Sequence, residues 1–193
     1  DYTALETCMN ANEQDLVTAD KYFDVEISGD WSSADTTAVI IHNYTTDTTR
    51  YINIYTTGNA RHAGKWSTSA YQLVAPKNST AITPASNNIY LTVNGLQIKT
   101  QPQDWNNRGG GVFSARIPQW KIINNIIRGS PRTTQDYIRG GSGIGGGDED
   151  SGDEGRVQPQ LAQRLHGFHP AAGVAGADHS AHPQAPARCR VGA

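Results

Sequence analysis

The sequence predicts an all-β protein with one short helix near its start. Threonine, asparagine, serine and glycine are abundant, while hydrophobic residues make up 36% of the chain and charged residues 18%. This composition suits strands and turns better than long helices. Several segments also alternate apolar and polar residues, which is typical of a strand with one buried face. A chain of 193 residues has room for one domain, or for one domain with a tail.

Each expected element follows from a local pattern. Segment 5–16 has apolar residues at helical spacing, and Thr3 stands three residues before Glu6 in a capping-box pattern, which predicts Thr3 as the N-cap. In the first expected strand Phe23, Val25 and Ile27 fall on one face. The expected strands cover residues 22–27, 39–41, 51–56, 71–74, 81–83, 89–98 and 120–127.

Two segments share a form in which an asparagine-led break interrupts an apolar run, with Asn94 at the first break and Asn124 at the second. Asparagine tolerates the left-handed backbone region, so these two are the expected structural turn residues. Asn94-Gly95 is also a strong hairpin signal, and a β-hairpin is the alternative. Recurrence at a coil-sized period favours a solenoid, in which the chain bends into a different parallel sheet and the asparagines of successive coils stack and bond.

The composition changes near Gly140, which predicts two parts, residues 1–139 and residues 140–193. The second part holds 12 of the 20 glycines, then an acidic cluster at 148–154, then a stretch rich in alanine, proline and histidine. Such a segment lacks the apolar residues to offset its ordering entropy, so we expect a disordered tail. A GC-rich gene read out of frame would give a similar composition.

The two cysteines, Cys8 and Cys189, lie near opposite ends of the chain. One disulfide could join them, but two such distant cysteines do not make a disulfide framework. The preferred interpretation is a small buried Cys8 and an exposed Cys189.

Charge and hydropathy exclude several classes of protein. With 16 basic and 18 acidic residues the formal net charge is -2, which argues against binding nucleic acid by charge alone. No apolar run is long enough for a membrane span. The chain has no starting methionine and no leader pattern, so we expect a mature form or a fragment.

The block Arg61-His62-Ala63-Gly64-Lys65-Trp66 is the most distinctive of several segments that resemble the right-handed parallel β-helix (pectate-lyase-like) proteins of bacteria and phages. The resemblance covers about residues 1–139. It implies a right-handed parallel β-helix, a solenoid, with an N-terminal capping helix, truncated after roughly two coils. The other matching segments are 1–6, 15–17, 29–31, 49–52, 91–98 and 122–129.

Two clusters are candidates for carbohydrate contact. Arg61, His62 and Trp66 could form a loop patch that binds a sugar, although we favour the alternative that they pin a long loop onto the first strands. A second loop joins a carboxylate, an indole and a guanidinium, which suits a carbohydrate contact but also an ordinary exposed loop. Its residues, with one further aromatic platform on a strand, are Asp104, Trp105, Arg108 and Trp120.

The sequence leaves the catalytic residues unknown. Asp104 and Asp136 could form the carboxylate pair of a glycoside hydrolase only if their coils stack in register. A zinc site could be drawn from two histidine pairs and a cysteine, but the surrounding tail offers no framework, so no metal site is expected. No cofactor is expected either, although calcium is possible if the chain is a lyase. The residues of the zinc alternative are His166, His169, His179, His182 and Cys189.

These patterns predict a secreted, cell-surface or phage-structural module that binds polysaccharide. The alternatives are an incomplete carbohydrate-active enzyme, either a polysaccharide lyase or a tailspike-like glycoside hydrolase, and a gene fragment without activity of its own. The expected partner is a polysaccharide or cell-surface glycan, outside the cell or on a virion, with no nucleic acid and no membrane span. The uncapped coil at 122–127 should expose apolar residues and favour self-association.

Overall fold

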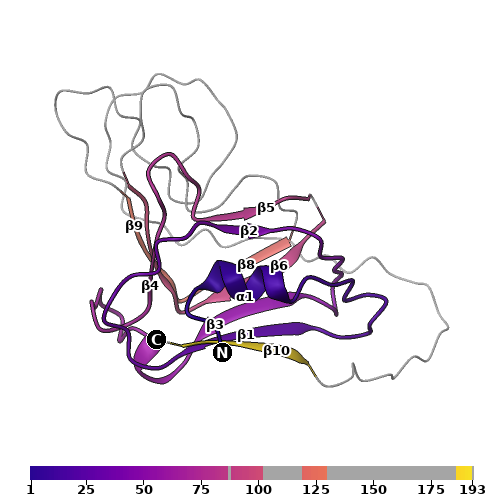
Figure 1. Ribbon diagram of the computed structural model, residues 1–193, viewed down its shortest axis with the longest axis horizontal. Coiled ribbons are helices and arrows are strands. Elements are labelled where there is room, and N and C mark those ends of the chain that lie inside the picture. The colour runs from indigo at the N-terminus through magenta and orange to yellow at the C-terminus, as the bar shows by residue number, and fades with distance from the viewer. Residues whose placement is uncertain (87, 102–118, 130–185, 193) are drawn as a thin grey trace, which may run out of the picture. The chain divides into compact units, whose positions relative to one another are not determined.

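The computed structural model describes residues 1–86, 88–101, 119–129 and 186–192 (Figure 1). Within these ranges the chain forms one α-helix, a short 3-10 helix and a series of short strands. These are α1 (Leu5–Ala11), β1 (Phe23–Ser28), β2 (Val39–Ile41), β3 (Ile52–Thr56), η1 (Gly58–Ala60), β4 (Gln72–Val74), β5 (Ile82–Pro84), β6 (Tyr90–Asn94), β7 (Gln97–Lys99), β8 (Gln119–Ile123), β9 (Ile126–Arg128) and β10 (Ala187–Gly192).

The strands form three sheets in which every pairing is parallel. The main sheet has the order β10-β1-β3-β6-β8, the second sheet has the order β4-β7-β9, and the third consists of β2 and β5. Parallel neighbours need a crossover connection, and no two strands that pair follow each other directly along the described chain. The helix α1 packs against β2 and β10 and lies between them in Figure 1.

The expected fold class, a truncated right-handed parallel β-helix with a disordered tail, is wrong. Such a solenoid would stack its coils in chain order, whereas the main sheet starts with the last strand, β10, beside the first, β1. Within the main sheet β1, β3, β6 and β8 follow chain order and β10 departs from it, while the other two sheets hold only three and two of the described strands. The expected disordered tail includes residues 187–192, but β10 is ordered because Cys189 and Val191 are buried against the core. Most of the remaining predicted tail lies outside the described residues.

The alternation expected in the first strand is confirmed. Phe23, Val25 and Ile27 are fully buried. The side chains between them lie on the opposite surface, which we call the outer face of the main sheet. Each fully buried residue of this size stabilises the fold by roughly 1.5–3 kcal/mol. The inner face continues across the neighbouring strands with Ile52, Ile54, Leu91 and Val93.

The break at Asn94-Gly95 is a corner between sheets and not a hairpin, since β6 belongs to the main sheet and β7 to the second sheet. The left-handed residue there is Gly95, with φ 83°, and not Asn94. Asn124 has φ 53° at the next corner, and the expected bond is present, with Asn124 Nδ2 donating to Asn94 Oδ1 at 3.4 Å. The register pairs Asn94 with Ile123, which places Gly95 opposite Asn124. The repeat is therefore one residue shorter than the asparagine spacing suggests.

The apolar residues of β8 and β9 are less buried than those of the preceding strands. Ile123 is 41% exposed, and Ile122 and Ile127 are partly buried. Val93 and Ile98, which pair with Ile122 and Ile127, are fully buried. The residues that follow β9 are not described, so the expected self-association through this end stays a prediction.

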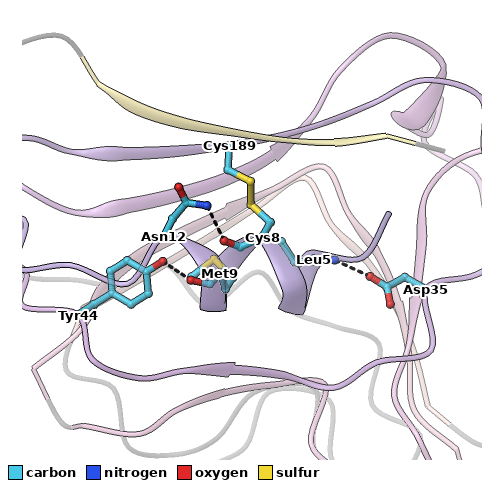
Figure 2. Close-up of a disulfide and its surroundings, with 7 residues drawn as sticks. All are labelled: Leu5, Cys8, Met9, Asn12, Asp35, Tyr44 and Cys189. Carbon is cyan, nitrogen blue, oxygen red and sulfur yellow. Dashed lines mark hydrogen bonds between the residues drawn. A yellow bond between two sulfur atoms is a disulfide. The ribbon is translucent and has the colours of Figure 1, made fainter. Parts of the chain in front are cut away.

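The helix α1 is capped from a distant part of the chain (Figure 2). The prediction of Thr3 as N-cap is wrong, because the N-cap position is Ala4, which provides no side-chain hydrogen bond. The backbone N–H of Leu5 donates instead to Asp35 Oδ2 at 2.9 Å. The expected capping partner Glu6 accepts a hydrogen bond from the backbone N–H of Ile40 at 2.7 Å, so it joins α1 to β2.

A disulfide joins Cys8 of α1 to Cys189 of β10, with a Cα–Cα distance of 6.2 Å (Figure 2). The expectation of an exposed Cys189 is therefore wrong, because its side chain is only 4% exposed. The backbone of Tyr2 adds a second link to β10, since its N–H donates to Arg190 O at 3.0 Å and its carbonyl accepts from Gly192 at 2.8 Å. Both ends of the described chain are thus held together at one edge of the main sheet.

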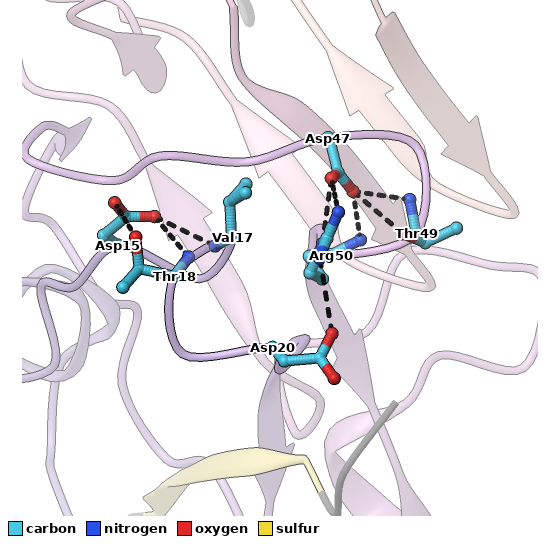
Figure 3. Close-up of polar contacts among 7 residues, drawn as sticks. All are labelled: Asp15, Val17, Thr18, Asp20, Asp47, Thr49 and Arg50. Carbon is cyan, nitrogen blue, oxygen red and sulfur yellow. Dashed lines mark hydrogen bonds and ion pairs between the residues drawn. The ribbon is translucent and has the colours of Figure 1, made fainter. Parts of the chain in front are cut away.

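Two aspartates hold turns by accepting backbone hydrogen bonds (Figure 3). Asp15 accepts from the N–H groups of Val17 and Thr18, both at 3.0 Å. Asp47 accepts from the N–H of Arg50 at 2.8 Å, and the Arg50 guanidinium binds the same carboxylate. The hydrogen bond from the Arg50 side chain is the main reason that the pKa of Asp47 lies well below its ordinary value.

This depressed pKa predicts an acid-dependent loss of stability. A carboxylate whose pKa is lower in the folded state stabilises the fold above its unfolded pKa of about 3.9, and the contribution is lost as the pH falls below that value. We expect Asp47→Asn to remove about 1 kcal/mol of stability at pH 7, a modest amount because the group lies near the surface. Urea unfolding between pH 7 and pH 2 measures it. The variant should show a shallower decline with acid than the wild type, and equal slopes would contradict the assignment. Asp20→Asn is the control, since it removes a single contact to Arg50 at 3.3 Å.

Candidate functional site

A cavity of about 430 Å³, which we call the loop pocket, lies along the segment that connects β3 to β4. Polar groups, one indole and two cationic side chains line it. The segment begins with η1, and Ala70 near its end is buried. The lining residues include Asp30, Asn59, Arg61, His62, Lys65, Trp66, Ser67 and Ser69. The structure therefore brings together the three residues of the predicted loop patch.

Arg61 fastens this loop to the ends of two neighbouring strands. Its guanidinium donates to the carbonyl of Thr56 at 3.2 Å and to Asn94 Oδ1 at 3.0 Å. Thr56 ends β3 and Asn94 ends β6, so one side chain spans adjacent strands of the main sheet. This is the pinning role that the sequence favoured for Arg61.

His62 continues the attachment to the next strand. Its Nε2 lies 2.8 Å from the carbonyl oxygen of Asn124, and its Nδ1 lies 3.1 Å from the backbone nitrogen of Gly64. A carbonyl only accepts and a backbone N–H only donates, so the ring carries a proton on Nε2 and accepts at Nδ1. His62 thus uses both ring nitrogens to hold the loop, which leaves neither as a free acid or base.

Trp66 is half-buried at the wall of the loop pocket, and the guanidinium carbon of Arg128 lies 4.6 Å from its ring centroid. This cation–π contact fixes the ring from one side. The next residue, Ser67, is held by the fully buried Gln97, whose Oε1 accepts from its N–H at 2.6 Å and whose Nε2 donates to its carbonyl at 2.8 Å. No sequence motif points to Gln97 or Arg128, because both act on the loop from strands of the second sheet.

The lining of the loop pocket also includes an acid–amide pair. Asn59 Nδ2 donates to Asp30 Oδ1 at 2.7 Å. Lys65 is exposed at the rim and supplies a cation on a long side chain. Ser67 and Ser69 add hydroxyl groups, which lie 2.8 Å from each other. The loop pocket therefore offers donors, acceptors and an aromatic surface on a framework that is fixed by hydrogen bonds.

The other predicted site residues that the structure describes do not line this pocket. Trp120, in β8, pairs with Leu91 of β6 and is partly buried against the core. It is therefore not a platform on the outer face. Cys189 is in the disulfide and cannot serve as a zinc ligand. The remaining candidates, Asp104, Trp105, Arg108, Asp136, His166, His169, His179, His182 and the acidic cluster at 148–154, lie outside the described residues.

Two structural features are absent from the described ranges. No cluster of three or more histidine, cysteine or acidic side chains that could hold a metal ion occurs among these residues. In the same part of the chain, no helix has the length and apolar character needed to cross a bilayer.

Comparison with known proteins adds no assignment. No protein family matches the chain, no curated protein matches it, and no solved structure matches it. The resemblance of residues 1–139 to pectate-lyase-like proteins stays an untested prediction.

Proposed function

We propose that this chain binds polysaccharide through the loop pocket, as a module that works outside the cell, on a cell surface or on a virion. The observation that carries the proposal is a half-buried indole held rigidly beside polar groups at a cavity of about 430 Å³. That volume lies within the usual range for small-ligand sites, about 300–1,000 Å³. A cavity of this size can hold one part of a glycan chain, while the remainder of the chain stays in solvent.

The chemistry of the pocket matches that of a sugar. The apolar face of a pyranose ring can pack on an indole such as Trp66, whose ring offers a large rigid apolar surface. Sugar hydroxyls both donate and accept, so they can bind the carboxylate of Asp30, the amide of Asn59 and the serine hydroxyls. Arg61 and His62 support binding indirectly, since their bonds to three strand ends hold the loop in place before the ligand arrives.

We propose binding and not cleavage at this site. Most glycoside hydrolases use two carboxylates that flank the scissile bond. Among the described residues that line the loop pocket, Asp30 is the single carboxylate, and it is already bonded to Asn59. The disulfide supports the extracellular part of the proposal, because disulfides persist mainly in oxidising compartments.

A glycan array followed by calorimetry tests this function. We expect the full chain to retain one class of polysaccharide, and Trp66→Ala to weaken that binding about tenfold or more, since the stacking surface is removed. Trp66→Phe should restore part of the affinity.

Tyr90→Ala is the matched control, because Tyr90 is also a half-buried aromatic residue but lies on β6, away from the pocket. This variant should bind as the wild type does. Absence of any retained glycan, or equal loss in Trp66→Ala and Tyr90→Ala, would overturn the proposal. Release of reducing ends during the assay would indicate the enzymatic alternative.

A further inference from the structure

A second cavity, of about 280 Å³, lies where the outer face of the main sheet meets the edge formed by β10. We call it the sheet-edge pocket. Charged and aromatic residues of three strands line it, Asp24 and Glu26 from β1, Tyr55 from β3, and Arg188 and Arg190 from β10, and Asp1 and Tyr2 line it as well. The volume lies just below the usual range for small-ligand sites, so the occupant must be small.

The register places opposite charges face to face. Asp24 pairs with Arg188 and Glu26 pairs with Arg190 across the β1–β10 ladder. Neighbouring strands lie about 4.8 Å apart, so a row of carboxylates runs beside a row of guanidinium groups. The outer face therefore separates negative from positive charge over the width of one strand.

These cross-strand charges are not neutralised by ion pairs alone. Arg190 lies 3.8 Å from Glu26, a long contact, and 60% of its side chain is exposed. Asp24 is nearly buried and accepts instead from Asn53 Nδ2 at 2.9 Å. Within the described part of the chain Arg188 forms no ion pair, although it stands opposite Asp24 in register. Its planar set of donors is open to a ligand.

Tyr55 lies on β3, next to the carboxylate row on β1, and lines the same pocket as the two arginines of β10. Partial burial, followed by the negative charges of Asp24 and Glu26, raises the pKa of its phenol, while the positive charge of Arg188 acts in the opposite direction. The phenol therefore keeps its proton at neutral pH and serves as a hydrogen-bond donor with an adjacent aromatic surface.

We propose that the sheet-edge pocket binds a small zwitterion of the size and charge pattern of a free α-amino acid. The carboxylate of the ligand binds Arg188 and Arg190, which suit bidentate recognition. Its ammonium group binds the carboxylates of Asp24 and Glu26, each of which also accepts a hydrogen bond, from Asn53 and Thr57 respectively. Tyr55 contacts the carbon skeleton between the two charges. This site is separate from the loop pocket and does not depend on the proposed glycan binding.

Titration of the full, oxidised chain with each of the twenty protein-forming L-amino acids, followed by NMR chemical shifts, tests the proposal. Two derivatives of the amino acid that binds most tightly are then titrated in the same way. Its carboxamide lacks the negative charge, and its N-acetyl derivative lacks the positive charge. We expect each derivative to bind about tenfold or more weakly than the parent amino acid, since each loses one charge-assisted contact.

Two variants assign these losses to the pocket. Arg188→Gln should reduce the preference for the amino acid over its carboxamide, and Asp24→Asn should reduce the preference over the N-acetyl derivative. Lys99→Gln is the matched control, because Lys99 is an exposed cation on β7 of the second sheet, and it should change nothing. Binding to the glycan array should be equal in all three variants. The proposal for the sheet-edge pocket and the proposal for the loop pocket can therefore be refuted separately.

The proposal is overturned if none of the twenty amino acids binds with a Kd below about 10 mM, which is about tenfold weaker than a millimolar ligand. It is also overturned if Arg188→Gln keeps the full preference over the carboxamide while its circular dichroism matches the wild type. Neither Asp24 nor Arg188 belongs to the hydrophobic core, so both variants leave its packing in place.

Discussion

Cys189→Ser is expected to lower the free energy of unfolding by about 5 kcal/mol, the largest effect that we expect of any single substitution in this chain. The disulfide joins residues that are 181 positions apart in the sequence, and it removes more conformational entropy from the unfolded chain as the closed loop grows. It also anchors β10, which α1 and Tyr2 hold at the edge of the main sheet. Urea unfolding of the oxidised protein, monitored by circular dichroism, measures the loss.

The double variant Cys8→Ala with Cys189→Ala separates the cross-link from the polarity of a buried serine. It should lose nearly as much stability as Cys189→Ser, because both remove the same loop closure. Addition of a reductant should lower the midpoint of the wild type to that of the double variant and leave the variant unchanged. A wild-type midpoint that does not respond to full reduction would refute the stabilising role of this disulfide.

Gly95→Ala is expected to destabilise the fold by about 3 kcal/mol, for two reasons that add. Gly95 has φ 83°, where an alanine costs about 1–2 kcal/mol because its Cβ crowds the backbone. A Cβ at this position would also crowd Thr56 Oγ1, at 2.6 Å, and the nearby guanidinium of Arg61. Arg61 would have to withdraw from Asn94, which releases the attachment of the loop pocket.

Gly64→Ala is the matched control for this prediction. Gly64 has φ 79°, but no atom lies within 4 Å of the position that a Cβ would take there, so only the conformational part of the loss should remain. The difference between the two variants in thermal or urea unfolding measures the effect of the Arg61 contact. Equal losses would show that the close approach of Arg61 to Gly95 has no energetic consequence. Glycan binding should weaken in Gly95→Ala alone.

Local patterns predicted the strands well because a strand encodes its faces in consecutive residues. Phe23, Val25 and Ile27 alternate with polar neighbours, and a period of two specifies which face is buried whatever the strand pairs with. The corner after Asn94 was equally readable, since Asn-Gly permits a left-handed residue. The motif did not specify which of the two residues adopts it; in the structure it is Gly95, while Asn94 stays in the strand and pairs with Ile123.

The helix cap shows where local reasoning fails. Thr3 and Glu6 have the spacing of a capping box, but Glu6 bonds to Ile40 and the first N–H of the helix bonds to Asp35. Both of these partners lie about thirty residues further along the chain. A capping motif describes only what the nearest residues can offer, whereas the folded chain provides an acceptor for the helix N-terminus and a donor for Glu6 from other segments.

The sequence by itself determined which short segments become strands, which side chains they bury and where Trp66 and its loop stand relative to them. Only the tertiary structure decided that the last strand pairs with the first, that Cys189 reaches Cys8, and that Arg188 faces Asp24. The physical reason is the range of each interaction. Side-chain alternation acts between neighbours, whereas pairing across most of the chain depends on loop-closure entropy and on core burial, to which all segments contribute together.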